Sequence, residues 1–168
     1  DLEDRWGVSA GAYREQGERW GVSFRLNYMD SEAITGATST DASLSMGLVY
    51  RPTDPQFIWL DRVDLVYDDA FDPLSGMART YKLINNLNLN HRPVARWQTS
   101  YQYAFKWVRA DFGDEYTAFT DLFGIDARYD LTPEWDVGGQ LYGLHSWESG
   151  TLDYALGVGI GHSFAKNV

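Results

Sequence analysis

The stretch WQTSYQYAFKW, residues 97–107, alternates between two kinds of side chain. Its odd positions are mostly aromatic, and its even positions are polar or small. A β-strand has a period of two, so this stretch predicts a strand with one apolar and one polar face. The alternation lasts for about eleven residues, which suits a strand tilted across a membrane and is about twice the usual length of a soluble strand.

A second stretch, LDYALGVGI at 152–160, repeats the pattern. Its apolar face carries leucine, tyrosine, valine and isoleucine, and its opposite face carries Asp153, Ala155 and glycines. A face made of such small and polar residues cannot pack the core of a β-sandwich. The stretch therefore predicts a membrane strand whose second face meets a polar lumen.

The same test along the chain predicts nine strands and a single domain over residues 1–168. The expected fold is all-β, an antiparallel up-and-down transmembrane β-barrel. The predicted strands cover residues 4–14, 18–29, 42–51, 56–68, 78–90, 95–109, 116–130, 134–147 and 151–164.

Composition excludes several other classes of protein. The chain has 168 residues, no cysteine and a net charge of -10. The missing cysteines exclude a disulfide scaffold, and the acidic charge argues against nucleic acid as a partner. There is no signal-peptide pattern and no apolar run near the ~18 residues of a membrane helix. A mean hydropathy of -0.39 still fits a membrane barrel, because only every second residue of its strands faces lipid.

The connections between the predicted strands fall into two sets that alternate along the chain. One set is compact (14–18, 51–56, 91–95, 130–134), and the other is mostly longer and acidic (30–41, 69–77, 110–115, 148–150). All five prolines fall in connections, as expected for residues that cannot enter a central strand. Short turns on one side and longer loops on the other are typical of outer-membrane barrels. This parity predicts Asp1 on the extracellular side and Val168 on the periplasmic side.

Tryptophans lie near the ends of the predicted strands, where membrane barrels carry interfacial aromatic residues. An alternative is a soluble lipocalin-like barrel with a tryptophan-filled core, but the polar face holds too many glycines, serines and asparagines to be that core. We therefore predict the seven tryptophans as membrane-interface residues: Trp6, Trp20, Trp59, Trp97 and Trp135 near strand starts, and Trp107 and Trp147 near strand ends.

Several segments resemble one family. These are FIWLDRVDLVYDD, KLINNLNLNHRP, YTAFTDLFGIDARYDLTPEWDVGGQLYGLHSW and LDYALGVGIGHSFAKNV. They resemble the C-terminal outer-membrane β-barrel domain of large proteobacterial surface proteins with immunoglobulin-like repeat arrays. The resemblance covers roughly residues 42–168 and implies an outer-membrane location in a Gram-negative bacterium. In that family a further strand or strands follow the AKNV turn.

The odd number of predicted strands also indicates that the barrel has strands beyond these nine. Bacterial single-chain barrels normally have an even number of strands, and unpaired edges in hydrocarbon cost several kcal/mol for each bare backbone group. We therefore expect a fragment lacking one or more strands, or a barrel completed by another chain.

Candidate chemistry is sparse. His145, with Ser146 and Glu148 and near Asp68 and Asp69, is a candidate general base of an outer-membrane hydrolase. The simpler interpretation is a residue at the barrel rim, so we predict no enzymatic activity, no catalytic residue and no cofactor. His91 and His162 are expected near the periplasmic headgroups. The acidic loops offer oxygen ligands for Ca²⁺ or Mg²⁺, but a solvated surface is the preferred interpretation, and no metal is predicted.

Three polar residues fall on the predicted lipid face. Asp61 lies near a turn, where it can reach headgroups. Asn85 and Asp121 lie nearer mid-strand, where a polar group in hydrocarbon is costly. They predict a contact with protein, unless a β-bulge at Gly124 turns the polar groups inward.

Two functions follow from the sequence. The first, a membrane anchor or export domain for a large surface-exposed region, is the favoured one, because barrels of about 8 to 10 strands are largely filled by side chains and open pores need roughly 16 strands. The alternative is a free-standing porin-like channel. The expected partners are outer-membrane lipids and lipopolysaccharide, the barrel-assembly machinery, and the strands or chain that complete the barrel.

Overall fold

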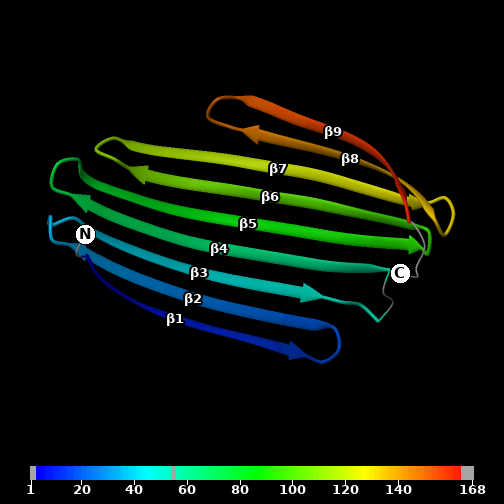
Figure 1. Ribbon diagram of the computed structural model, residues 1–168, viewed down its shortest axis with the longest axis horizontal. Helices are drawn as coiled ribbons and strands as arrows, with labels where there is room; N and C mark the ends of the chain where they lie inside the picture. Colours follow the sequence, from blue (N-terminus) through cyan, green and yellow to red (C-terminus); the bar gives the residue numbers. More distant parts are fainter. Residues whose placement is uncertain (1–2, 54–55, 164–168) are drawn as a thin grey trace.

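The computed structural model describes residues 3–53 and 56–163, which form nine antiparallel strands in one sheet. Each strand pairs with its neighbours in sequence, from β1 to β9 (Figure 1). This confirms the all-β, up-and-down architecture. The strands are β1 (Glu3–Gln16), β2 (Trp20–Ala33), β3 (Thr38–Tyr50), β4 (Phe57–Asp72), β5 (Gly76–Val94), β6 (Trp97–Asp111), β7 (Glu115–Asp130), β8 (Trp135–Ser146) and β9 (Thr151–His162).

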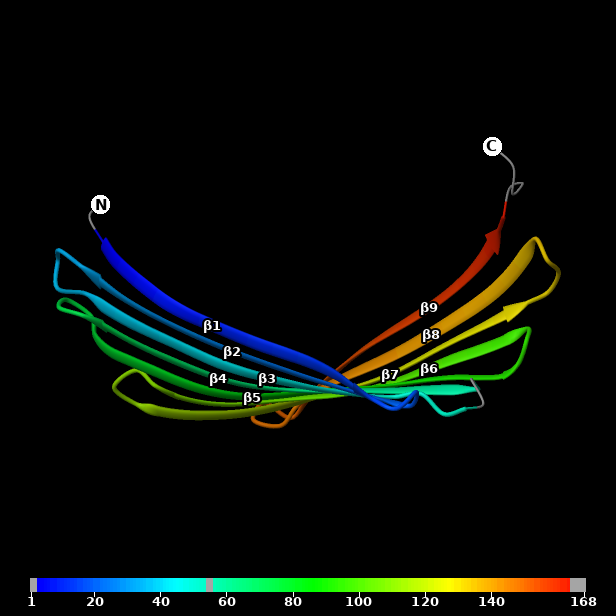
Figure 2. The ribbon, with the colours of Figure 1, turned by 90° about the horizontal axis from the view of Figure 1, so that it is seen from below.

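The sheet is curved but not closed. Figure 2 shows it bending so that β1 and β9 rise on the same side. Within the described residues, β1 and β9 are the outer strands and do not pair with each other. All nine predicted ranges overlap an observed strand; Phe164, the last residue of the ninth range, lies outside the described residues, as do Asp1 and Val168.

The strands meet at two ends of the sheet. We call the end with connections 17–19, 51–56, 95–96 and 131–134 the proline end, and the end with connections 34–37, 73–75, 112–114 and 147–150 the acidic end. The proline end lies on the right of Figure 1 and the acidic end on the left. Glycines with φ between 63° and 100° close the turns at Gly17, Gly36, Gly76, Gly113 and Gly150.

The predicted difference between short turns and long loops is wrong. The acidic segments that we expected to be loops instead extend the strands, so β2 runs to Ala33 and β4 to Asp72. Polar cross-strand contacts hold these extensions: Thr40 donates a 2.9 Å hydrogen bond to Asp30, and the hydroxyls of Ser31 and Ser39 lie 2.8 Å apart. Apolar alternation cannot detect such polar hairpin ends.

The prediction that every proline lies in a connection also needs correction. Pro93 lies inside β5, near its end, where the pairing with β6 shifts between His91 and Val94. A proline is tolerated at such an irregularity because its missing N–H breaks no regular ladder bond. Pro52, Pro73 and Pro133 lie in connections, and Pro55 is outside the described residues.

Candidate membrane-facing and lumen-facing surfaces

One face of the sheet is apolar across its strands, and we call it the apolar face. Cross-strand pairing places Leu44 of β3 between Leu26 of β2 and Leu65 of β4. Farther along the sheet, Tyr103 of β6 pairs with Phe123 of β7. The register therefore joins the alternation of single strands into one continuous apolar surface.

No other described part of the chain covers this face. Val158 in the outer strand β9 is 86% exposed, and Tyr103 near the centre of the sheet is 38% exposed. Among the described residues, Ala110 is the one buried apolar side chain. A soluble sheet buries its apolar face against a second layer. The exposed apolar face is instead suited to contact with lipid.

A row of aromatic rings borders the apolar face at the proline end. The rings of Trp20 and Tyr50 have centroids 4.4 Å apart, and those of Trp97 and Tyr129 are 5.8 Å apart. The Trp135 ring lies 4.3 Å from that of His162. Members of this proline-end row are Trp20, Tyr50, Phe57, Trp59, Trp97, Tyr129 and Trp135.

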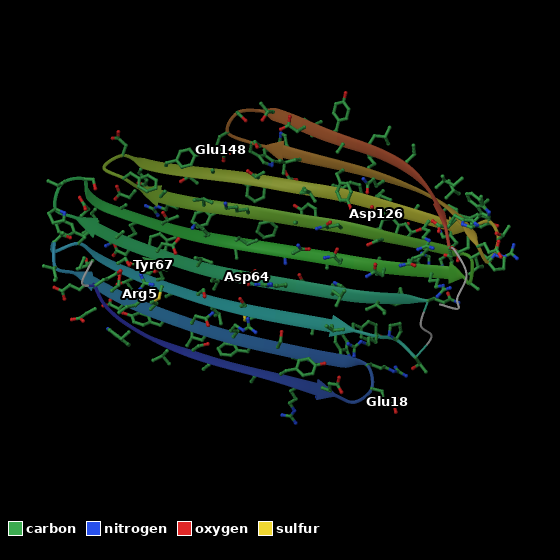
Figure 3. All side chains as sticks on the ribbon, viewed as in Figure 1. Arg5, Glu18, Asp64, Tyr67, Asp126 and Glu148 are labelled. Carbon is green, nitrogen blue, oxygen red and sulfur yellow. The ribbon has the colours of Figure 1, made fainter. Side chains whose placement is uncertain are left out.

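A second row lies toward the acidic end. Trp6 and Tyr28 have centroids 5.2 Å apart, and Tyr67 and Tyr81 are 5.0 Å apart. In Figure 3, Tyr67 lies toward the acidic end, as Arg5 does, while Glu18 marks the proline end. Members of this acidic-end row are Trp6, Tyr28, Tyr67, Tyr81, Trp107, Phe119 and Trp147.

The seven predicted interface tryptophans are thus divided four to three between the rows. Trp6 joins Trp107 and Trp147, because β1 starts at the acidic end whereas β2 starts at the proline end. The sequence did not single out the tyrosines of the second row. These tyrosines follow the alternating pattern of their own strands, but only the cross-strand register shows that they lie side by side in one row.

The opposite face, which we call the polar face, carries hydroxyl, amide, charged and glycine residues. Asn27 of β2 accepts a hydrogen bond from Ser9 of β1 at 2.8 Å and donates one to Ser43 of β3 at 3.1 Å. Ion pairs join neighbouring charged residues, with Lys82 2.6 Å from Asp68. Figure 3 places Asp64 in the middle of the sheet and Asp126 nearer the proline end. Such a face is suited to line a wet lumen.

Asn85 and Asp121 both lie on the apolar face. The pairing of β7 with β6 and with β8 runs without a shift through Gly124, so the alternative of a bulge at this position is wrong. Gly124 instead lies on the polar face under the ring of Tyr142, to which it is paired. The sequence does not reveal this packing, because it depends on the register between β7 and β8.

Each of these polar groups has a partner within the sheet. The amide of Asn85 donates a 2.6 Å hydrogen bond to Asp61. The indole N–H of Trp147 donates a 2.9 Å hydrogen bond to Asp121, and His145 Nδ1 lies 3.5 Å from the same carboxylate. The carboxyl groups of Asp61 and Asp121 nevertheless stay on the apolar face.

The candidate hydrolase group does not assemble. His145 pairs with Asp121 on the apolar face, whereas Ser146, its neighbour in sequence, points to the polar face. Asp68 and Asp69 belong to β4, and the strands β5, β6 and β7 separate them from β8. The expected proximity of His145 to these aspartates is therefore wrong. Glu148 accepts a hydrogen bond from the backbone N–H of Phe119.

Within the described segments, no three histidine, cysteine, aspartate or glutamate side chains form a group able to hold a metal ion. The same segments contain no helix with the length and apolarity needed to cross a membrane.

Comparison with known proteins gives a fold but no family. No family model matches the chain, and no curated protein matches it. The anion-selective porin from Comamonas acidovorans is similar in structure, with a TM-score of 0.64 and 14% identity over 94% of this chain. The chain spans 49% of that porin's length. The match to the NanC porin covers 98% of this chain and 100% of the NanC chain, with a TM-score of 0.48 and 11% identity. The likeness to the Comamonas acidovorans porin shows that the described strands have the fold of part of a β-barrel wall.

Proposed function

We propose that these strands form part of the wall of an outer-membrane β-barrel in a Gram-negative bacterium, and that the polar face lines a water-filled, porin-like channel. The observation that carries the proposal is the two-sided sheet, which has an uncovered apolar face between two aromatic rows and a polar face behind it.

The spacing of the aromatic rows supports a membrane position. Strands rise about 3.3 Å per residue and tilt by about 40° in barrels. The distance along the barrel axis is then about 20 Å from Trp59 to Tyr67 in β4 and about 25 Å from Trp97 to Trp107 in β6. Outer-membrane barrels have an apolar band about 25 Å tall between their aromatic girdles.

The open edges support a barrel with more strands. Bare backbone groups of β1 and β9 in hydrocarbon would cost several kcal/mol each, so further strands of the same polypeptide or of a partner chain complete the wall. Small barrels are filled by their own side chains, whereas barrels of roughly 16 strands enclose water. The similar porin is also about twice as long as this chain, which favours the larger barrel.

A second candidate is the anchor or export domain of a large surface protein. The resemblance of residues 42–168 to that barrel family favours it, and the same apolar face would serve it. Both candidates have lipids, lipopolysaccharide and the barrel-assembly machinery as partners, and neither uses covalent chemistry.

Conductance across planar lipid bilayers distinguishes the two. We expect the complete polypeptide, purified in detergent and inserted into a bilayer, to give stepwise ion currents. Stable insertion without current, together with an attached surface region that external protease removes, would favour the anchor. Hydrolysis of phospholipid that is lost in His145→Ala would contradict both.

A further inference from the structure

We propose that a hollow on the polar face, between β1 and β4 around Arg25 and Arg62, binds small anions that carry phosphate or carboxylate groups. Access to the hollow rests on the proposed function, because solutes reach the polar face of a completed barrel only through its lumen.

The hollow is built from two neighbouring cross-strand rows. Arg25 lies in the row with Gly11 and Ser45, and Arg62 lies in the next row with Ser23 and Gly47. Tyr13 extends the second row on β1. These residues line a hollow of about 610 Å³.

Glycines keep the floor of the hollow open. A Cβ atom added to Gly47 would overlap the hydroxyl of Ser23, and one added to Gly11 would lie 3.3 Å from the backbone oxygen of Phe24. Any larger residue at Gly47 would therefore fill the space beside Arg62.

Arg25 supplies a positive charge that no carboxylate offsets. Within the described residues it makes no ion pair, and its cross-strand partners Gly11 and Ser45 carry no charge. Asp64 on β4 follows Ser45 in the row of Arg25 and carries the nearest carboxylate of the two rows. This carboxylate already forms an ion pair with Arg62, with 2.9 Å between Oδ2 and Nε. The hollow thus keeps the net charge of one free guanidinium, although the whole chain is acidic.

The polar groups suit an oxyanion. A guanidinium presents several N–H donors in a planar fork that matches carboxylate and phosphate oxygens. The hydroxyls of Ser23 and Ser45 add donors on the same face. Arg25 is an exposed side chain, so it can turn toward a ligand without breaking an existing contact.

The test is the binding of inorganic phosphate and of acetate to the complete polypeptide in a maltoside detergent, measured by calorimetry. This detergent carries no phosphate, so lipid headgroups cannot supply the ligand. We expect Arg25→Gln to weaken binding at least about tenfold, as the loss of a hydrogen bond to a charged group does. Gly47→Val, which fills the hollow and leaves its charge unchanged, should weaken it as well.

Lys106→Gln is the matched control. Lys106 lies in the same cross-strand row as Arg25 but outside the hollow, and no ion pair involves it within the described part of the chain. Equal losses in Arg25→Gln and Lys106→Gln, or no binding by the unchanged protein, would overturn the anion site. Conductance separates the two proposals. If the protein conducts ions but Arg25→Gln leaves phosphate binding unchanged, only the anion site is contradicted. If the protein binds phosphate through Arg25 but does not conduct ions, only the channel is contradicted.

Discussion

At the scale of single residues, the side of the sheet decides what a substitution does. Tyr103 and Gln102 are neighbours in β6, but Tyr103 lies on the apolar face opposite Leu87, and Gln102 lies on the polar face opposite Asn88. The same substitution at these two positions therefore places the new side chain on the apolar face in one case and on the polar face in the other.

We expect Tyr103→Arg to lower the free energy of unfolding in lipid vesicles by about 2–4 kcal/mol, because it places a charge near the centre of the lipid-facing band. Gln102→Arg, which faces the lumen, should cost much less. Urea titration followed by tryptophan fluorescence measures both, and equal losses would contradict the assignment of the faces.

Gly124 provides a second test at this scale. An added Cβ would overlap the ring of Tyr142, so Gly124→Ala should destabilise the protein by about 1–3 kcal/mol through overpacking. Gly159 also lies on the polar face, but nothing lies within 4 Å of an added Cβ there. Gly159→Ala should change the same unfolding free energy by less than about 0.5 kcal/mol. A harmless Gly124→Ala would show that the Tyr142 ring moves freely.

At the scale of elements, the hairpin of β4 and β5 extends beyond Tyr67 and ends in a turn outside the apolar band. Asp72 accepts hydrogen bonds from the backbone N–H groups of Ser75 and Leu74 at 2.9 and 2.8 Å, and from the Ser75 hydroxyl at 3.1 Å. These bonds hold the pKa of Asp72 below its usual range.

A lowered pKa in the folded state means that the turn is stabilised above the unfolded value of about 3.9 and loses this support as the pH falls through the folded value. Amide hydrogen exchange at Leu74 and Ser75 should therefore lose protection as the pH falls below about 4. Asp72→Asn should remove this pH dependence. An unchanged dependence in Asp72→Asn would assign it to another group.

The polar residues on the apolar face lie on β4, β5 and β7, and their hydrogen bonds within the sheet leave the carboxyl groups of Asp61 and Asp121 on that face. We propose that a hydrogen-bonding protein surface covers this part of the face. A photoreactive amino acid at Asn85 or Asp121 should give protein adducts, whereas one at Tyr103 should give lipid adducts. Lipid adducts alone at all three positions would contradict the contact.

At the scale of the whole molecule, the exposed apolar face has no counterpart to bury it, because the described strands form a single layer. We expect the protein to stay in the membrane fraction after carbonate extraction and to need detergent for a folded, monodisperse state. Circular dichroism and sedimentation measure this. A folded monomer in buffer without detergent would contradict the membrane assignment.

The alternation at 97–107 and 152–160 determined the strands and their two faces, because period-two patterning is a local property of the chain. The alternation did not predict the strand ends in hairpins such as 30–41, because the strands there are polar on both faces. Only the register between strands decided that Tyr28, Tyr67 and Tyr81 belong to one aromatic row, that His145 meets Asp121, and that Arg25 and Arg62 share a hollow. These relations join residues far apart in sequence, and pairing across strands is what brings them together.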